Sequence, residues 1–127
     1  MQIDLPEPLA ELTAAFDRYE AALIGNDVAT LDALFAPGPR TIRYGVAENL
    51  YGGDEILAFR QSRPSAGLAR RLSRTVITTY GTGFGTASTL FHRAGAPGKV
   101  GRQMQSWVKF DSGWRVVAAH VSLIDEA

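Results

Sequence analysis

The architecture of the chain can be worked out from residues 100–123, which read VGRQMQSWVKFDSGWRVVAAHVSL. β-Branched and aromatic residues are frequent on both sides of Asp111-Ser112-Gly113, a pattern typical of two antiparallel strands joined by a tight turn. Two further stretches of this kind, residues 72–80 and 85–92, come before it, and a short glycine-bearing connection follows each. The sequence therefore predicts a meander of four antiparallel strands at residues 72–80, 85–92, 100–110 and 114–123.

The part of the chain before this meander has the apolar spacing of helices. From Pro8 to Ile24 apolar side chains recur every three or four residues. A second, short helix is expected after Asn26 or Asp27, and a third between an Asp54 cap and Pro64, with short strands at residues 41–45 and 49–51. Long strands in a small domain can cover a core only by curling. We therefore expect an α+β fold with a cone-shaped, curved antiparallel sheet wrapped around three N-terminal helices.

Length and composition favour one globular domain covering residues 1–127. Apolar residues make up 46% of the 127 residues, which suffices for one core but not for two. Cysteine is absent, which excludes a disulfide scaffold, a thiol nucleophile and a cysteine-ligated metal. No apolar run is long enough for a membrane span, and the first residues do not read as a signal peptide, so we expect a cytoplasmic protein.

The net charge is zero, but the charges are unevenly distributed. Residues 1–59 hold ten acids and three bases, and residues 60–127 hold three acids and ten bases, so we expect the two halves to face each other. Eleven of the thirteen bases are arginine, which suits planar recognition of carboxylate or phosphate. The bases are scattered without an interleaved aromatic platform, so nucleic acid is not an expected partner.

Motifs along almost the whole chain resemble one protein family. The closing stretch Gly113–Ser122 is similar to the end of SnoaL-like domains in the nuclear transport factor two superfamily, a resemblance that is weakly specific for function. More selective motifs are Tyr19-Glu20, Asn26-Asp27, Thr41–Gly45, Glu48–Gly52, Ile56–Arg60 and Gly101–Trp107. With these motifs the chain resembles the AtzH-like family, and it departs from that pattern at Met104, where a small polar residue is more usual.

This resemblance implies an activity. It implies a cofactor-free decarboxylating amidohydrolase of cyanuric acid (s-triazine) catabolism, which converts 1,3-dicarboxyurea to allophanate and carbon dioxide. Similar domains occur in front of amidase-signature enzymes, so the alternative is a non-catalytic ligand-binding or accessory domain with an amidase partner. The tyrosine and arginine pair of the family matches Tyr19 and Arg43 in this sequence.

The residues themselves fit such chemistry. A dicarboxylated urea is a small dianion, so its pocket needs arginine forks and one weak acid near the nitrogen that gains a proton. Arg43 lies in the middle of a strand, on a face expected to line the interior, and Tyr19 lies on the apolar stripe of the first helix. We expect Tyr19 and Arg43 to be catalytic, with Arg43 also binding a carboxylate. A core tyrosine, and an arginine paired with Glu48 or Glu20, are the structural alternatives.

Alternation alone leaves open which face of the sheet lines the pocket. On the strand at 100–110, Gln103 and Gln105 lie on one face, and Met104 and Ser106 lie on the other. A three-residue hairpin turn places four residues on one face: Met104, Ser106, Ala118 and His120. Because serine and alanine leave space, we interpret this face as the interior one and expect Ser106 and His120 to bind substrate.

The opposite face of the sheet is apolar enough to be an interface. It carries Trp107, Val117, Ala119 and Val121 among polar residues. We therefore expect a homodimer that forms through the sheet face. Such a dimer is compatible with an enzyme and with an accessory domain.

Other kinds of chemistry have less support in the sequence. Isomerase or dehydratase activity, typical of the wider superfamily, normally requires an inward acidic or histidine base, and on the strands only His120 is a candidate. The two histidines have no acidic residue at ligand spacing beside them, so we expect no metal site. A serine nucleophile elbow is also missing, which favours noncovalent proton transfer without a cofactor.

Overall fold

The computed structural model describes residues 1–127 and contains three helices and six strands. The helices are α1 (Pro6–Ile24), α2 (Val28–Ala33) and α3 (Gly53–Ser62). The strands are β1 (Ile42–Tyr44), β2 (Asn49–Tyr51), β3 (Arg71–Tyr80), β4 (Phe84–His92), β5 (Lys99–Phe110) and β6 (Gly113–Asp125). All the predicted elements are present, and most of their ends differ from the prediction by one or two residues. None of the helices combines the length and apolar character that crossing a membrane requires.

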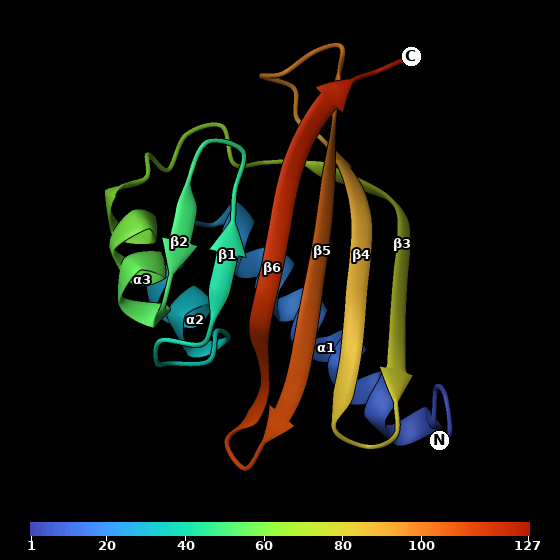
Figure 1. Cartoon of the computed structure of the whole chain (residues 1–127). Helices are drawn as coiled ribbons and strands as arrows, with labels where there is room; N and C mark the ends of the chain where they lie inside the picture. The colour runs from blue at the N-terminus through green and yellow to red at the C-terminus, as the bar shows by residue number, and fades with distance from the viewer.

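The strands form one sheet in the order β2-β1-β6-β5-β4-β3. The four long strands make the predicted antiparallel meander, and the sheet curls around α1, which covers one of its faces (Figure 1). β1 extends the sheet beyond β6 in a parallel pairing, with Ile42 opposite Ala118, so the sheet is mixed rather than wholly antiparallel. This pairing joins distant parts of the chain, and no turn between them specifies its direction. The α+β class is the one predicted.

The residues that precede α2 and α3 determine where these two helices begin. The Asp27 side chain caps α2, because its Oδ1 accepts a hydrogen bond from the Thr30 N–H at 3.2 Å. The prediction that Asp54 caps α3 is wrong: α3 begins after Gly52, whose φ of 89° is accessible to glycine, and Asp54 lies in the first turn. There the carboxylate still interacts favourably with the positive end of the helix.

Helix α1 supplies the apolar layer that covers the sheet. Leu12, Phe16, Tyr19 and Leu23, spaced by three or four residues, are all buried. The contact with β4 is close, because a Cβ atom on Gly85 would lie 2.3 Å from Leu12 Cδ2. The predicted amphipathic stripe is therefore the surface that α1 packs against the sheet.

A β-bulge determines which residues of β6 face α1. Trp107 pairs with Val116, but the next pair along the ladder joins Ser106 to Ala118, so Val117 is an extra residue. The buried residues of β6 are therefore Trp114 and Val116 before the bulge and Ala119 and Val121 after it.

The interior assignment of Ser106 and His120 is wrong. Ser106 pairs with Ala118, and Met104 pairs with His120, but these four residues share the outer face. Met104 is 63% exposed. The face predicted to be an interface is instead the inner one, where three of its residues are buried: Trp107, Ala119 and Val121. The reason is that burying the large indole stabilises the fold far more than burying serine or alanine.

Candidate functional site

Tyr19 and Arg43 both lie in the interior, as predicted. Tyr19, on α1, is 2% exposed, and Arg43, in the middle of β1, is 6% exposed. Arg43 also makes the ion pair that was its structural alternative, because its Nη1 donates a hydrogen bond to Glu48 Oε1 at 2.9 Å. Both side chains are therefore buried, and one nitrogen of the arginine is engaged by a carboxylate.

Tyr19 lies within a cluster of positive charges. Burial raises the pKa of the Tyr19 phenol, but the charges of Arg60, Arg43 and Arg70 lower it more, so its pKa lies below the ordinary value. Two further arginines, from the loops that follow α3 and β4, also interact electrostatically with this phenol. We call the five residues the arginine cluster: Arg43, Arg60, Arg63, Arg70 and Arg93.

Three members of the arginine cluster form no ion pair with an acidic residue of the chain. Two members are paired with glutamates: Arg43 with Glu48, and Arg70 with Glu20. Arg60, Arg63 and Arg93 form no ion pair. Arg60 is 0% exposed, and none of its three guanidinium nitrogens has a hydrogen-bond partner. A buried charge without an ion-pair partner is unfavourable, so this region favours the binding of an anion.

Other hydrogen-bond donors in the interior also lack an acceptor. Of the ten buried side-chain polar atoms without a partner, eight are nitrogens of five residues: Arg60, Arg63, Arg93, Gln103 and Gln105. A surplus of donors is complementary to a ligand rich in acceptors, such as a carboxylate or a phosphate. By contrast, no three His, Cys, Asp or Glu side chains gather in a way that could hold a metal ion.

Aromatic rings support the guanidinium groups. The guanidinium carbons lie 4.5–5.5 Å from ring centroids: Arg43 and Arg63 at Phe59, Arg70 and Arg93 at Phe91, and Arg60 at Phe35. Contacts of this kind stabilise a desolvated cation without neutralising it. The rings therefore fix the positions of the arginines and leave their charge available to a ligand.

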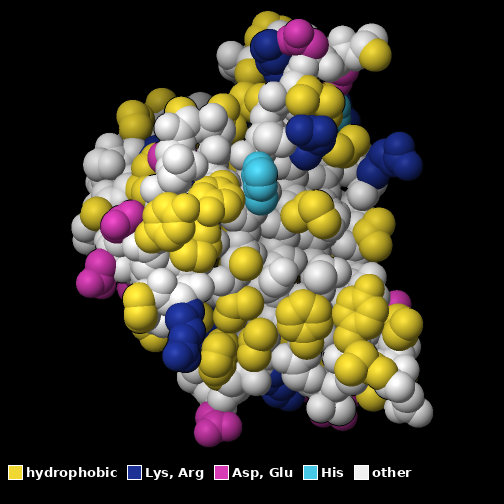
Figure 2. Space-filling view, in the orientation of Figure 1, with side chains coloured by type: hydrophobic (Ala, Val, Ile, Leu, Met, Phe, Trp, Pro, Cys, Tyr) yellow, Lys and Arg dark blue, Asp and Glu magenta, His cyan; other side chains and the backbone are white.

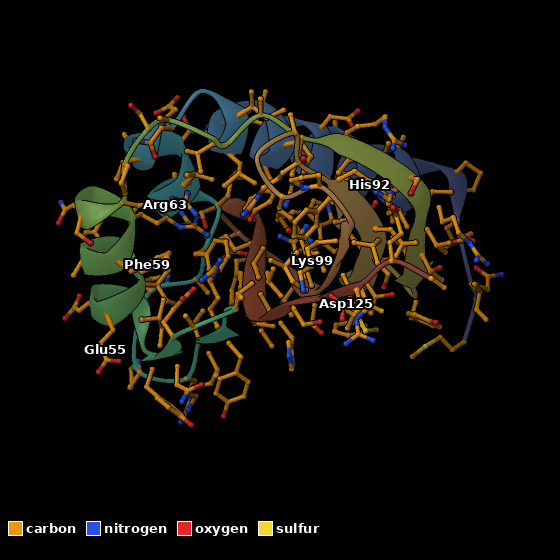
Figure 3. The ribbon with its side chains drawn as sticks, turned by 90° about the horizontal axis from the view of Figure 1, so that it is seen from above. Glu55, Phe59, Arg63, His92, Lys99 and Asp125 are labelled. Atoms are coloured by element: carbon orange, nitrogen blue, oxygen red, sulfur yellow. The ribbon has the colours of Figure 1, made fainter.

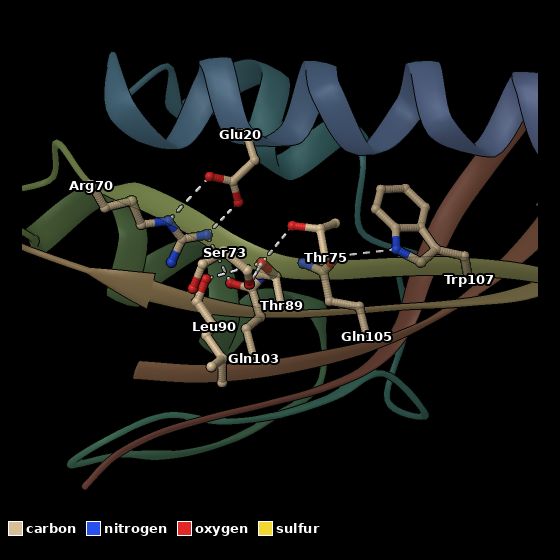
Figure 4. A network of polar contacts seen from close by, with 9 residues as sticks. All are labelled: Glu20, Arg70, Ser73, Thr75, Thr89, Leu90, Gln103, Gln105 and Trp107. Carbon is tan, nitrogen blue, oxygen red and sulfur yellow. Dashed lines mark hydrogen bonds and ion pairs between the residues drawn. The ribbon is translucent and has the colours of Figure 1, made fainter. Parts of the chain in front are cut away.

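Arg70 ties α1 to the sheet beside this cluster (Figure 4). Its Nε donates to Glu20 Oε2 at 3.1 Å, and its Nη2 donates to the other Glu20 oxygen and to Gln103 Oε1, the latter at 3.0 Å. Gln105 Oε1 accepts a hydrogen bond from Trp107 Nε1 at 3.1 Å. The two glutamines thus occupy the inner face, contrary to the expectation that Met104 and Ser106 line the interior. The contact between Glu20 and Arg70 also joins the acidic and basic halves of the chain, as expected.

An open pocket of about 520 Å³ borders the arginine cluster. Arg70, Arg71, His92 and Arg93 belong to its lining. Figure 3 looks down on this end of the molecule, with Arg63 on the α3 side and His92 on the opposite side. Because Arg70 and Arg93 belong both to the pocket and to the cluster, an anion that approaches here meets a positively charged opening.

Ser106 and His120 lie on the outer face of the sheet, opposite the arginine cluster. With Tyr44, Met104 and Ala118 they border a shallow depression of about 420 Å³. The His120 ring packs edge-on against Tyr44, with ring centroids 6.0 Å apart. The structure therefore does not bring Ser106 and His120 together with the candidate catalytic pair.

The sequence patterns did not single out the rest of the cluster. For Arg60 a signal was present, because it follows Ile56 by four residues and so lies on the buried face of α3. Arg63 continues this spacing three residues later. Arg70 and Arg93 lie between elements, where no periodicity reports the direction of a side chain.

The fold defines the class of protein: an α+β cone of the nuclear transport factor 2-like (NTF2-like) kind. A structure from Cytophaga hutchinsonii described as an NTF2-like protein matches with a TM-score of 0.69 and 18% identity over 89% of this chain and 95% of that one. An NTF2-like superfamily protein from Salmonella enterica matches with a TM-score of 0.71 and 24% identity over 94% and 92%. At these identities the likeness concerns the fold alone.

The chain belongs to the AtzH-like family, whose model matches residues 1–127. A Pectobacterium atrosepticum protein of unknown function from the DUF3225 family is 60% identical over 97% of this chain and 95% of its own, with a TM-score of 0.94. A cystatin-like fold protein from Burkholderia xenovorans is 45% identical over 100% and 99%, with a TM-score of 0.96. The curated proteins contain no match. The family resemblance inferred from the motifs is confirmed.

Proposed function

We propose that this protein is a cofactor-free decarboxylating amidohydrolase that converts 1,3-dicarboxyurea to allophanate and carbon dioxide. The observation that carries the proposal is the arginine cluster, in which three guanidinium groups form no ion pair and whose charges interact with a Tyr19 phenol of lowered pKa. Membership of the AtzH-like family supports it, because the motifs of that family imply this reaction.

The chemistry of the substrate suits the donors of the interior. 1,3-Dicarboxyurea carries a carboxylate at each end and a carbonyl between them, so most of its polar atoms are acceptors. The interior offers the opposite, with eight buried nitrogens that lack acceptors. Arginine forks are suited to planar carboxylates, and a dianion supplies the negative charge that the cluster lacks.

Decarboxylation needs one bond broken and one proton delivered. The bond between a carboxylate carbon and the adjacent nitrogen breaks, its electron pair stays on the nitrogen, and the carboxylate leaves as carbon dioxide. The nitrogen takes a proton from the Tyr19 hydroxyl, directly or through a water molecule, and water then returns a proton to the phenolate. The nearby guanidinium groups stabilise that phenolate, consistent with the lowered pKa of Tyr19.

Release of carbon dioxide from freshly generated 1,3-dicarboxyurea tests this proposal. With the uncatalysed decay subtracted and a metal chelator present, the wild-type protein is expected to accelerate the reaction. Tyr19→Phe should lower the rate by about 100-fold, the scale of a lost general acid. Arg43→Ala should lower it as well, whereas Arg40→Ala, at an exposed arginine, should not. If the wild-type protein does not exceed the background rate, the reaction is ruled out and the accessory domain of an amidase becomes the better proposal.

A further inference from the structure

Arg60 differs from the other members of the arginine cluster, because it is 0% exposed and none of its guanidinium nitrogens forms an ion pair with a carboxylate, although the Tyr19 phenol and, more weakly, Asp32 interact with its charge. All three are buried and unpartnered. The neighbours of its guanidinium carbon are two aromatic rings, Phe35 at 4.8 Å and Tyr19 at 5.9 Å. An arginine keeps its charge in a protein, and no carboxylate forms an ion pair with this one, so its positive charge is available to a ligand.

Arg43 is the weaker cation of the two. Glu48 Oε1 accepts a hydrogen bond from its Nη1 at 2.9 Å and offsets part of its charge. Gly45 makes this contact possible, since a Cβ atom there would lie 1.7 Å from that same oxygen. The site therefore offers two unequal arginines, one in an ion pair with a carboxylate and one without an ion pair.

The proposed reaction also has two unequal carboxylates. The carboxylate that leaves loses its charge as carbon dioxide forms, so a strong cation bound to it stabilises the substrate more than the transition state and slows the reaction. The other carboxylate stays charged throughout, and a strong cation can hold it without this penalty. The stronger arginine therefore suits the retained carboxylate.

We propose that Arg60 binds the carboxylate that remains in the product, and that Arg43, moderated by Glu48, binds the carboxylate that is lost. This inference rests on the proposed function and adds a specificity-determining residue to it. It makes the site a receptor for small dicarboxylates in which the two ends have different partners.

Two stable probes separate the two ends. Glutarate has the same number of chain atoms between its carboxylates as 1,3-dicarboxyurea and imitates the substrate. Malonamate has the shape of allophanate and carries only the retained carboxylate. Calorimetric titration of both probes should be made with the wild-type protein, Arg60→Met, Arg43→Met and the control Arg40→Met.

Arg60→Met is expected to weaken the binding of both probes by about 100-fold, which corresponds to the loss of two charge-assisted hydrogen bonds. Arg43→Met should weaken glutarate to a similar extent but change malonamate less than threefold, because malonamate lacks the carboxylate that Arg43 holds. Arg40→Met should change neither. If Arg60→Met does not fold, Arg60→Lys serves instead, with a loss of about tenfold for both probes, because lysine keeps the charge but not the fork.

Three results would overturn the inference: unchanged glutarate binding in the Arg60 variants, malonamate binding that depends on Arg43, or no binding of glutarate by the wild-type protein. Its failure can be told apart from failure of the proposed function. Carbon dioxide release that does not depend on Arg60 keeps the reaction and removes the inference. Arg60-dependent binding of both probes without carbon dioxide release keeps the dicarboxylate site and removes the reaction.

Discussion

Gly101 lies directly opposite Phe91 in the ladder between β4 and β5, and the Phe91 ring occupies the space that a side chain on residue 101 would need. A Cβ atom on Gly101 would lie 2.1 Å from the Cζ atom of this ring. The same ring supports Arg70 and Arg93, at 4.5 and 5.0 Å from its centroid. Because Gly101 has no side chain, the Phe91 ring can lie where it contacts Arg70 and Arg93.

Gly101→Ala is therefore expected to disturb the fold and the site together. The added methyl group must push the Phe91 ring aside, and overpacking of this kind lowers the free energy of unfolding by about 2 kcal/mol. Urea unfolding measures this effect, and glutarate titration measures the displacement of Arg70 and Arg93 as weaker binding. Gly95→Ala is the matched control, because a Cβ atom there meets nothing within 4 Å. Equal stability of the two variants would contradict the close packing of Phe91 on Gly101.

Arg60→Met is expected to make the ligand-free protein more stable. The substitution removes a buried charge that has no partner and keeps an apolar chain of similar length. Replacing buried ionic groups with apolar ones raises the free energy of unfolding by about 1–3 kcal/mol in comparable cases. Thermal unfolding without added anions measures the change. A lower Tm than that of the wild-type protein would mean that Arg60 is held by favourable contacts within the chain.

The phenol of Tyr19 is expected to ionise at lower pH than an ordinary tyrosine. Burial raises its pKa, but the charges of Arg60, Arg43 and Arg70 lower it more. Ultraviolet titration should therefore show one tyrosinate forming below the usual range, which Tyr19→Phe removes. In Arg60→Met the same transition should move to higher pH. Since the proposed proton donor is the neutral phenol, the rate of decarboxylation should fall as the pH rises through this lowered pKa.

Glu20→Gln is expected to be strongly destabilising. The side chain of Arg70 is 1% exposed, and the substitution removes the only carboxylate paired with it. Breaking one side of a buried ion pair costs about 3 kcal/mol. The exposed pair between Glu11 and Lys109 is the control, because solvent screens this pair and Glu11→Gln should change the free energy of unfolding much less. If urea unfolding gives similar losses for both variants, Glu20 does not act as the counter-charge of Arg70.

The elements, and the inward position of Tyr19 and Arg43, could be predicted because both depend on local periodicity. Tyr19 repeats the spacing of its apolar neighbours on α1, and Arg43 lies on the inner face of a short strand. The prediction of which face of β5 and β6 lies in the interior was wrong for a different reason. The small residues Ser106 and Ala118 suggested space for a ligand, whereas the burial of Trp107 decides the face.

The arginine cluster could not be assembled from local patterns. Its members come from β1, α3 and two loops, and they meet only because the sheet curls and brings the ends of β3 and β4 over α1. Contacts such as that between Glu20 and Arg70 join residues fifty positions apart. The uneven distribution of acids and bases predicted that the halves face each other, but it did not show which arginines would remain without an acid.

The outer face of the sheet, which no helix of the chain covers, is expected to bind the same face of a second copy. Figure 2 shows apolar and uncharged groups over much of this face. Its centre holds large Met104 and Tyr44 next to small Ser106 and Ala118, so a twofold-related copy can set large residues against small ones without charge repulsion. Light scattering should give twice the chain mass of 13.7 kDa for the wild-type protein. Replacing both Met104 and Ala118 with lysine should give a monomer, and Ile24→Lys, at an exposed apolar residue on α1, should leave the dimer intact. A wild-type monomer, or a dimer that survives both lysines, would show that this face is not the interface.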